Sequence, residues 1–128
     1  MKTDIKTHVS LYQSLHFEDK FPPDNFAFEN IVLSPRADNL KASLAIMRKA
    51  LIEDNEFVAG IFIGGMEGIE EEFELFRKTN PTALALPIAS TGAAARILFD
   101  RNSEDFDTRL LNDYAYMAMF RDLLSKFL

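Results

Sequence analysis

Two segments of the sequence combine glycine with side chains that can hold a polar ligand. The first runs from Gly64 to Glu72, and the second runs from Ser90 to Arg96. Each follows an apolar run typical of a strand and precedes a helical pattern. Both would therefore lie at the carboxyl ends of strands, where open α/β sheets bind ligands.

The first segment is rich in glycine and in acid. Gly64, Gly65 and Gly68 allow a sharp turn and a close backbone approach to a ligand, and Met66 lies between them. The glutamates that follow are Glu67, Glu70, Glu71 and Glu72. Carboxylates would repel a phosphate but accept hydrogen bonds from a ribose diol, so this loop predicts a sugar site. The alternative for each glutamate is a solvated helix face with favourable dipole placement.

The second segment has the chemistry that an anion needs. Ser90 and Thr91 supply hydroxyl donors, Gly92 opens the turn, and Arg96 lies about one helical turn further on. Backbone N–H groups at a helix start add to these donors. The hypothesis from the residues is that this loop holds a phosphate while the first holds its sugar. The alternative is a helix cap followed by close packing of small residues.

Composition excludes several other classes of function. Acidic residues outnumber basic ones by 20 to 14, the net charge is −6 and the pI is near 4.9, so we expect no duplex nucleic acid partner. The absence of cysteine excludes disulfides, zinc–thiolate sites and a cysteine nucleophile. With only two histidines, we expect neither a metal site nor a cofactor. No apolar run approaches the roughly 20 residues that span a bilayer, so we expect a cytoplasmic protein without a membrane partner.

The elements that would position these loops alternate along the chain. Strands are expected at residues 8–15, 30–34, 57–63 and 82–88, and the apolar run 57–63 suits a central strand covered on both faces. Helices are expected at 40–52, 67–79, 90–99, 114–127 and around 110–111, the first of them capped by Asp38 or Asn39. The pattern predicts one α/β domain over residues 1–128, a Rossmann-like three-layer sandwich with a mostly parallel sheet of about four strands.

Two further features suggest packing or partners. Tyr12, at the end of the first strand, either stacks on a base or packs in the core. The last helix carries an apolar stripe of Met117, Phe120, Leu123, Leu124 and Phe127, with Tyr116 beside it. The stripe faces either the core or a second copy, and we expect a homo-oligomer.

The two loops also carry a family resemblance. The segments 64–73 and 86–92 resemble the SLOG superfamily, which includes LOG-type phosphoribohydrolases, lysine decarboxylase-like proteins and DNA-processing proteins. The similarity is greatest to SLOG modules that are predicted to sense nucleotide-derived signals in bacterial defence systems. It implies binding of a molecule with ribose and phosphate, such as an ADP-ribose-type ligand.

The match to the LOG enzyme motif is incomplete. Its glycines correspond to Gly64, Gly65 and Gly68, and its glutamate corresponds to Glu72. Ile69 replaces the motif threonine, a proline is lost, one residue is inserted, and the catalytic arginine has no clear counterpart. Binding without catalysis is therefore favoured. The alternatives are nucleoside-monophosphate N-glycosidic cleavage, with Glu72 or Glu71 as the catalytic carboxylate, and a structural oligomerisation module.

The resemblance also implies an incomplete sheet. A complete SLOG domain begins with a central strand and its own glycine-rich loop, before the segment that corresponds to residues 9–14. Without that strand, we expect two unpaired strand edges and an exposed apolar strip. Either the sheet closes up or a neighbouring chain covers the strip.

Overall fold

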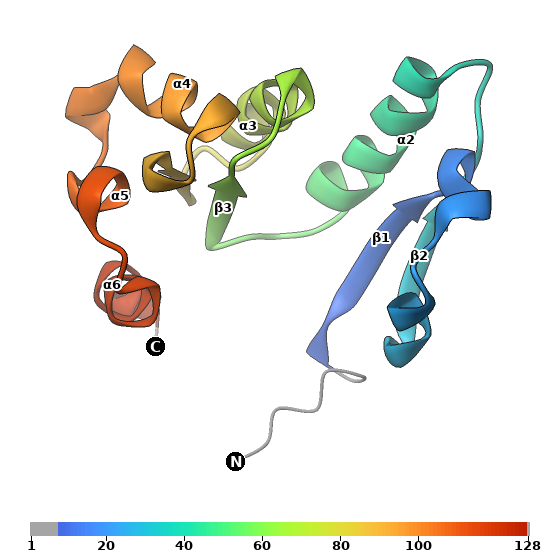
Figure 1. Ribbon diagram of the computed structural model, residues 1–128, viewed down its shortest axis with the longest axis horizontal. Coiled ribbons are helices and arrows are strands. Elements are labelled where there is room, and N and C mark those ends of the chain that lie inside the picture. Colours follow the sequence, from blue (N-terminus) through green and yellow to red (C-terminus); the bar gives the residue numbers. More distant parts are fainter. Residues whose placement is uncertain (1–7, 128) are drawn as a thin grey trace. The chain divides into compact units, whose positions relative to one another are not determined.

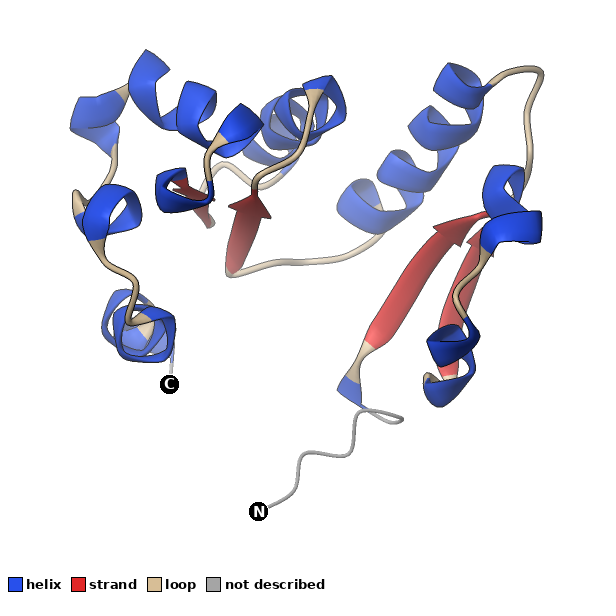
Figure 2. Cartoon of the chain, viewed as in Figure 1, coloured by secondary structure: helices blue, strands red, loops and turns tan. Residues whose placement is uncertain are grey.

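The computed structural model describes residues 8–127 and divides the chain into two compact units, 1–55 and 56–128 (Figures 1 and 2). Each unit contains one pair of strands and at least one covering helix. No helix in the described part of the chain has the length and apolar character that crossing a membrane requires.

The first unit is a parallel strand pair with one long helix. Strands β1 (Ser10–Ser14) and β2 (Asn30–Ser34) pair in parallel, and the 3-10 helices η1 (Leu15–Lys20) and η2 (Pro23–Ala27) form the connection between them. Helix α2 (Leu40–Glu53) follows and lies against both strands. The Asn39 side chain accepts a hydrogen bond of 2.8 Å from the Ala42 N–H, which confirms the predicted cap.

The second unit begins with a β–α–β motif. Strand β3 (Ala59–Ile63) is parallel to β4 (Leu84–Ile88), and helix α3 (Glu67–Thr79) connects them. The elements after β4 are helical: η3 (Ala89–Thr91), α4 (Ala93–Arg101), η4 (Ser103–Asp105), α5 (Arg109–Asn112), α6 (Tyr116–Leu123) and η5 (Ser125–Phe127). These elements place both candidate loops in the same unit, after β3 and after β4.

The four predicted strands are present, and each is parallel to the strand with which it pairs. Within residues 8–127 they make two sheets of two strands, β1–β2 and β3–β4. The mixed α/β class is therefore confirmed, and the strands are hydrogen-bonded in two pairs. β1 and β3 each have a partner on one side only among these residues.

Strand β3 differs from the predicted strand with two covered faces. Phe62 is buried under α3, but Ile61 is 42% exposed and Ile63 is 61% exposed on the opposite face. The physical reason is that α3 covers one face and the described residues leave these two isoleucines accessible. An apolar run can therefore mark a strand correctly and still misstate its burial.

Aromatic rings fill the space beneath α3. Phe62 meets Phe73 at a ring-centroid distance of 5.1 Å and Phe76 at 5.7 Å, both edge-to-face. Gly60 permits this approach, because a Cβ atom there would lie 2.9 Å from Phe76 Cζ. A second set of buried residues, around Leu86, Phe99 and Leu110, joins β4 to the helices that follow.

The apolar stripe of the last helix is only partly in the core. Helix α6 is shorter than predicted, and its fully buried residue is Met119. Tyr116, Phe120, Leu123 and Leu124 pack around that core, whereas Met117 is 78% exposed.

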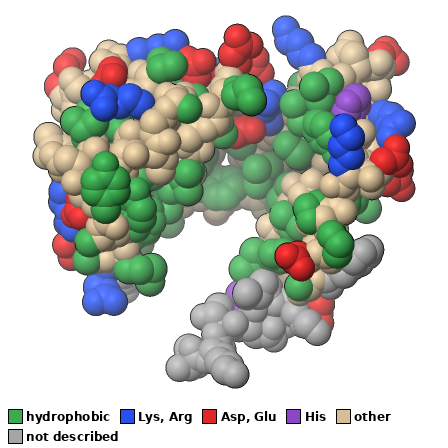
Figure 3. Space-filling model, viewed as in Figure 1, with side chains coloured by type: hydrophobic (Ala, Val, Ile, Leu, Met, Phe, Trp, Pro, Cys, Tyr) green, Lys and Arg blue, Asp and Glu red, His purple; other side chains and the backbone are tan. Residues whose placement is uncertain are grey.

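On the face seen in Figure 3, acidic and basic side chains are interspersed over the described surface.

An ion-pair cluster joins α5 to α6. Arg109 Nε donates to Asp113 at 2.9 Å and its Nη1 donates to Asp122 at 2.8 Å. The Ala115 N–H donates to the Asp113 carboxylate at 2.8 Å, and this bond, together with the Arg109 bond, lowers the pKa of Asp113. A carboxyl group whose pKa is lowered by folding stabilises the folded state at every pH above the pKa that it has in the unfolded chain. This stabilisation is lost as the pH falls through the pKa that the group has in the folded protein.

We therefore expect Asp113→Asn to reduce stability at neutral pH and to have less effect in acid. Urea midpoints measured between pH 7 and pH 2 should show the variant and the wild type converging below about pH 4, the ordinary range of an aspartate pKa. A midpoint difference that stays constant across this range would contradict the assignment.

Candidate functional site

The glycine-rich loop turns through a left-handed backbone. Gly64 has φ +51° and Gly65 has φ +81°, values that other residues adopt at a cost. A Cβ atom at Gly65 would lie 2.1 Å from Ile69 Cγ1, so the helix start closes over this glycine. Helix α3 begins at Glu67, and Met66 precedes it without a side-chain cap.

The loop after β4 contains a second left-handed turn. The strand ends at Ile88, η3 follows, and Gly92 has φ +74° before α4 begins at Ala93. Ala93 itself has φ +51°, which makes it the non-glycine residue with a left-handed conformation in the described chain. The predicted helix start at Ser90 therefore lies three residues too early, because η3 occupies that position.

Hydrogen bonds join the two loops. The Gly64 N–H donates to Thr91 Oγ1 at 2.8 Å, and Thr91 Oγ1 donates to the Ile88 carbonyl. The first amides of α4 complete the connection, since Ala94 N donates to the Gly65 carbonyl at 3.2 Å and Ala95 N donates to the Gly64 carbonyl at 3.1 Å. The second loop thus holds the shape of the first.

This arrangement differs from the one that the sequence predicts. The residue types of the second loop predict that its helix-start amides meet an anion, whereas the Ala94 and Ala95 amides donate to the two glycine carbonyls. The signal that could have indicated this is the run Ala93–Ala95, whose small side chains allow another backbone to come close. The N–H groups at the start of α3, on Glu67 and Gly68, are the ones that helix geometry leaves without an intrahelical acceptor.

The polar side chains of the second loop have intramolecular partners. The Ser90 hydroxyl lies 2.9 Å from the Tyr116 hydroxyl, and Arg96 Nε lies 3.0 Å from the Asp100 carboxylate. Arg96 and Asp100 are both about half exposed, so their pairing contributes about 0.3–0.5 kcal/mol at most.

The glutamates of α3 have different surroundings. Glu70 pairs with Arg101 of α4 at 2.6 Å, which assigns it a structural contact. Glu67 and Glu71 are exposed and Glu72 is half-buried. The acidic turn therefore presents Glu67 beside the glycine loop, whereas Glu70 joins the two helices.

Tyr12 belongs to the first unit. Its hydroxyl accepts a hydrogen bond of 2.9 Å from Asn55 Nδ2, and the same amide donates to the Leu51 carbonyl at 2.9 Å. Asn55 thus connects the end of α2 to β1, a role that its sequence context did not indicate. Among the residues that the structure describes, no group of three or more histidine, aspartate or glutamate side chains could hold a metal ion.

Comparison with known protein families shows to which family the chain belongs. A model of the SLOG cluster3 family matches residues 1–124, so the chain belongs to this SLOG family. The match covers both compact units and both loops. No curated protein and no solved structure gave a significant match.

The left-handed conformation of Ala93 has a measurable cost. For an L-residue this conformation costs about 1–2 kcal/mol, and glycine avoids the cost at an entropic penalty of about 0.5–1 kcal/mol. Ala93→Gly is therefore expected to leave the free energy of unfolding unchanged or to raise it by up to about 1 kcal/mol.

The matched control is Ala118→Gly, an exposed alanine within α6. It should lower the free energy of unfolding by about 0.5–1 kcal/mol, measured by urea denaturation. Equal losses in the two variants would show that Ala93 carries no backbone strain.

Proposed function

We propose that this SLOG protein binds a nucleotide-derived small molecule that contains ribose and phosphate, such as an ADP-ribose-type ligand. The observation that carries the proposal is the hydrogen-bonded connection of the two loops. Thr91, Ala94 and Ala95 hold the left-handed glycine turn in place. A turn fixed before binding loses little conformational entropy when a ligand arrives.

The ligand lies across the start of α3 in this proposal. The N–H groups of Glu67 and Gly68 face the loop without intrahelical acceptors, and the helix dipole adds partial positive charge there. The side chain of Met66, which is 83% exposed, provides a thioether for contact with an aromatic base. The Glu67 carboxylate accepts hydrogen bonds from the ribose hydroxyls.

The phosphate is assigned to the second loop. Ser90 and Arg96 exchange Tyr116 and Asp100 for phosphate oxygens, to which a guanidinium donates charge-assisted hydrogen bonds. As part of the same proposal, the strand pairs belong to a Rossmann-like three-layer sandwich. Family membership supports this architecture. The resemblance to sensing modules supports a signalling protein of bacteria, and the partly exposed apolar stripe of the last helix supports a homo-oligomer.

A thermal-shift screen tests the proposal. The probes are NAD, ADP-ribose, cyclic ADP-ribose and AMP, each up to millimolar concentration. A ligand at about 100 times its dissociation constant adds about 2.7 kcal/mol to the free energy of unfolding. At least one probe is expected to raise the melting temperature, and the absence of a shift with all four would refute the proposal.

Two exposed methionines provide a matched pair of variants. Met66→Glu places a negative charge at the proposed ligand site, whereas Met117→Glu places the same charge on α6. The first should abolish the shift and the second should retain it. Release of adenine from AMP that is lost in Glu72→Gln would instead favour the N-glycosidase alternative.

A further inference from the structure

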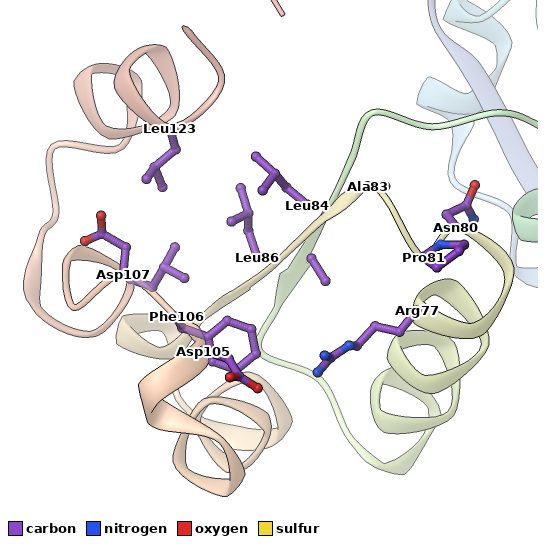
Figure 4. Close-up of a pocket in the computed structure, with 12 residues that line it drawn as sticks. Arg77, Asn80, Pro81, Ala83, Leu84, Leu86, Asp105, Phe106, Asp107 and Leu123 are labelled. Atoms are coloured by element: carbon purple, nitrogen blue, oxygen red, sulfur yellow. The ribbon is translucent and has the colours of Figure 1, made fainter. Parts of the chain in front are cut away.

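A cavity of about 320 Å³ lies in the second unit (Figure 4), and none of the residues that line it belongs to the glycine loop. Consecutive residues from Ala83 to Leu86 line it, so the cavity follows the first half of β4. Residues at the end of α3 and in the segment 105–107 form its other walls. The glycine loop packs against the opposite end of the β3–β4 pair, beyond Ile63 and Ile88.

The free edge of β4 forms the floor of this cavity. Within residues 8–127, β4 pairs only with β3. The Leu84 N–H donates to the Val58 carbonyl at 3.0 Å, so the peptide groups of Leu84 face β3. Because peptide groups alternate along a strand, those of Ala85 face the free edge. The peptide groups of Pro87 face the same free edge, but proline has no N–H. The hydrogen-bond donors of this edge therefore end before Pro87.

The two faces beside this edge differ in chemistry. Leu84 and Leu86 lie toward Leu123, and together they make an apolar wall (Figure 4). On the other side, Arg77 extends from α3 toward Asp105 (Figure 4). The cavity therefore has one apolar wall and one wall with charges of both signs.

The charges of the second wall are available to an occupant. The Arg77 guanidinium lies 5.5 Å from the centre of the Phe73 ring, and none of the ion pairs found in the described chain joins it to Asp105. Asp107 differs, because its carboxylate accepts a hydrogen bond of 2.9 Å from the Arg109 N–H. Arg77 and Asp105 thus complement an occupant that carries both charges on one face.

We propose that the free edge of β4 binds a short extended peptide as a third strand. Main-chain hydrogen bonds to Ala85 supply affinity, and the small side chain of this residue leaves room for the guest. Side chains of a strand alternate between faces, so apolar residues of the peptide meet Leu84 and Leu86. The intervening residues, one acidic and one basic, meet Arg77 and Asp105. This site is independent of the proposed nucleotide function.

Three synthetic pentapeptides test the proposal by amide NMR titration of the whole protein. They are acetyl-Val-Glu-Val-Lys-Val-amide and the two analogues with Glu–Glu or Lys–Lys at the charged positions. The mixed peptide is expected to shift the amide resonances of residues 83–86 and to bind on the order of tenfold more tightly than either analogue.

Variants separate the charge contribution from the ladder contribution. Arg77→Glu should transfer the preference to the Lys–Lys peptide, whereas Arg121→Glu, an exposed charge reversal on α6, should leave the preference unchanged. Ala85→Pro should weaken all three peptides, because it removes the edge N–H in the same register as Pro87. Absence of shifts at residues 83–86 in the wild type, or an unchanged order of affinities in Arg77→Glu, would overturn the proposal.

Discussion

Phe73→Ala is expected to lower the free energy of unfolding of the second unit by about 3–5 kcal/mol. Phe73 is 2% exposed, and its ring lies 5.1 Å from Phe62 and 6.2 Å from Phe106. Truncation removes both edge-to-face contacts and leaves a cavity between α3 and β3. Since a small domain is stable by only about 5–15 kcal/mol, much of the unit's stability is lost.

Urea denaturation followed by circular dichroism measures this effect. Tyr114→Ala is the control, because Tyr114 is an exposed aromatic residue of the same unit. Its effect should stay within about 0.5 kcal/mol. A loss below about 1 kcal/mol in Phe73→Ala would mean that the ring is not in a close-packed core.

Gly65→Ala is the second substitution with a large expected effect. The left-handed backbone costs an alanine about 1–2 kcal/mol, and the new methyl group would collide with Ile69, which adds an overpacking cost of about 1–3 kcal/mol. We expect a loss of about 2–5 kcal/mol in the free energy of unfolding and a loss of nucleotide-dependent stabilisation.

Gly64→Ala is the matched control for this substitution. Gly64 also has a positive φ, but the nearest atom to a Cβ there is the Thr91 carbonyl oxygen at 3.9 Å. It should therefore show the backbone cost of about 1–2 kcal/mol alone. Adding Ile69→Ala to Gly65→Ala should relieve the collision. The free energy that Gly65→Ala costs should therefore be smaller in the Ile69→Ala background than in the wild type. Equal losses for the two glycines would contradict the close packing of Ile69 over Gly65.

Local elements were predictable because their signals lie within a few residues. The Asn39 cap, the helical spacing of α2 and the apolar run of β4 each identify an element without long-range information. No local sequence pattern predicts which strands pair with one another. An apolar strand has the same residue pattern whether it pairs with one neighbouring strand or with two. The same limit explains the incorrect burial of Ile61 and Ile63.

The candidate site was predictable in its residues but not in its contacts. Glycine spacing indicated both turns, and Gly64, Gly65 and Gly92 have the positive φ values that such turns use. Sequence could not show that Thr91 and the α4 amides bind the first loop, since those bonds join residues 27 to 31 positions apart. In the structure, the Thr91 hydroxyl and the α4 amides therefore bind the first loop, whereas the residue types alone predict that they bind a ligand.

An amide NMR titration of the protein with ADP-ribose tests the central claim most directly. The proposed site predicts saturable shifts of the resonances of residues 64–68, together with shifts at Ser90 and Arg96. Met66→Glu should abolish these shifts and Met117→Glu should preserve them. Shifts that are absent up to millimolar ligand, or that are confined to residues 83–86 at the free edge of β4, would contradict nucleotide binding at the glycine loop.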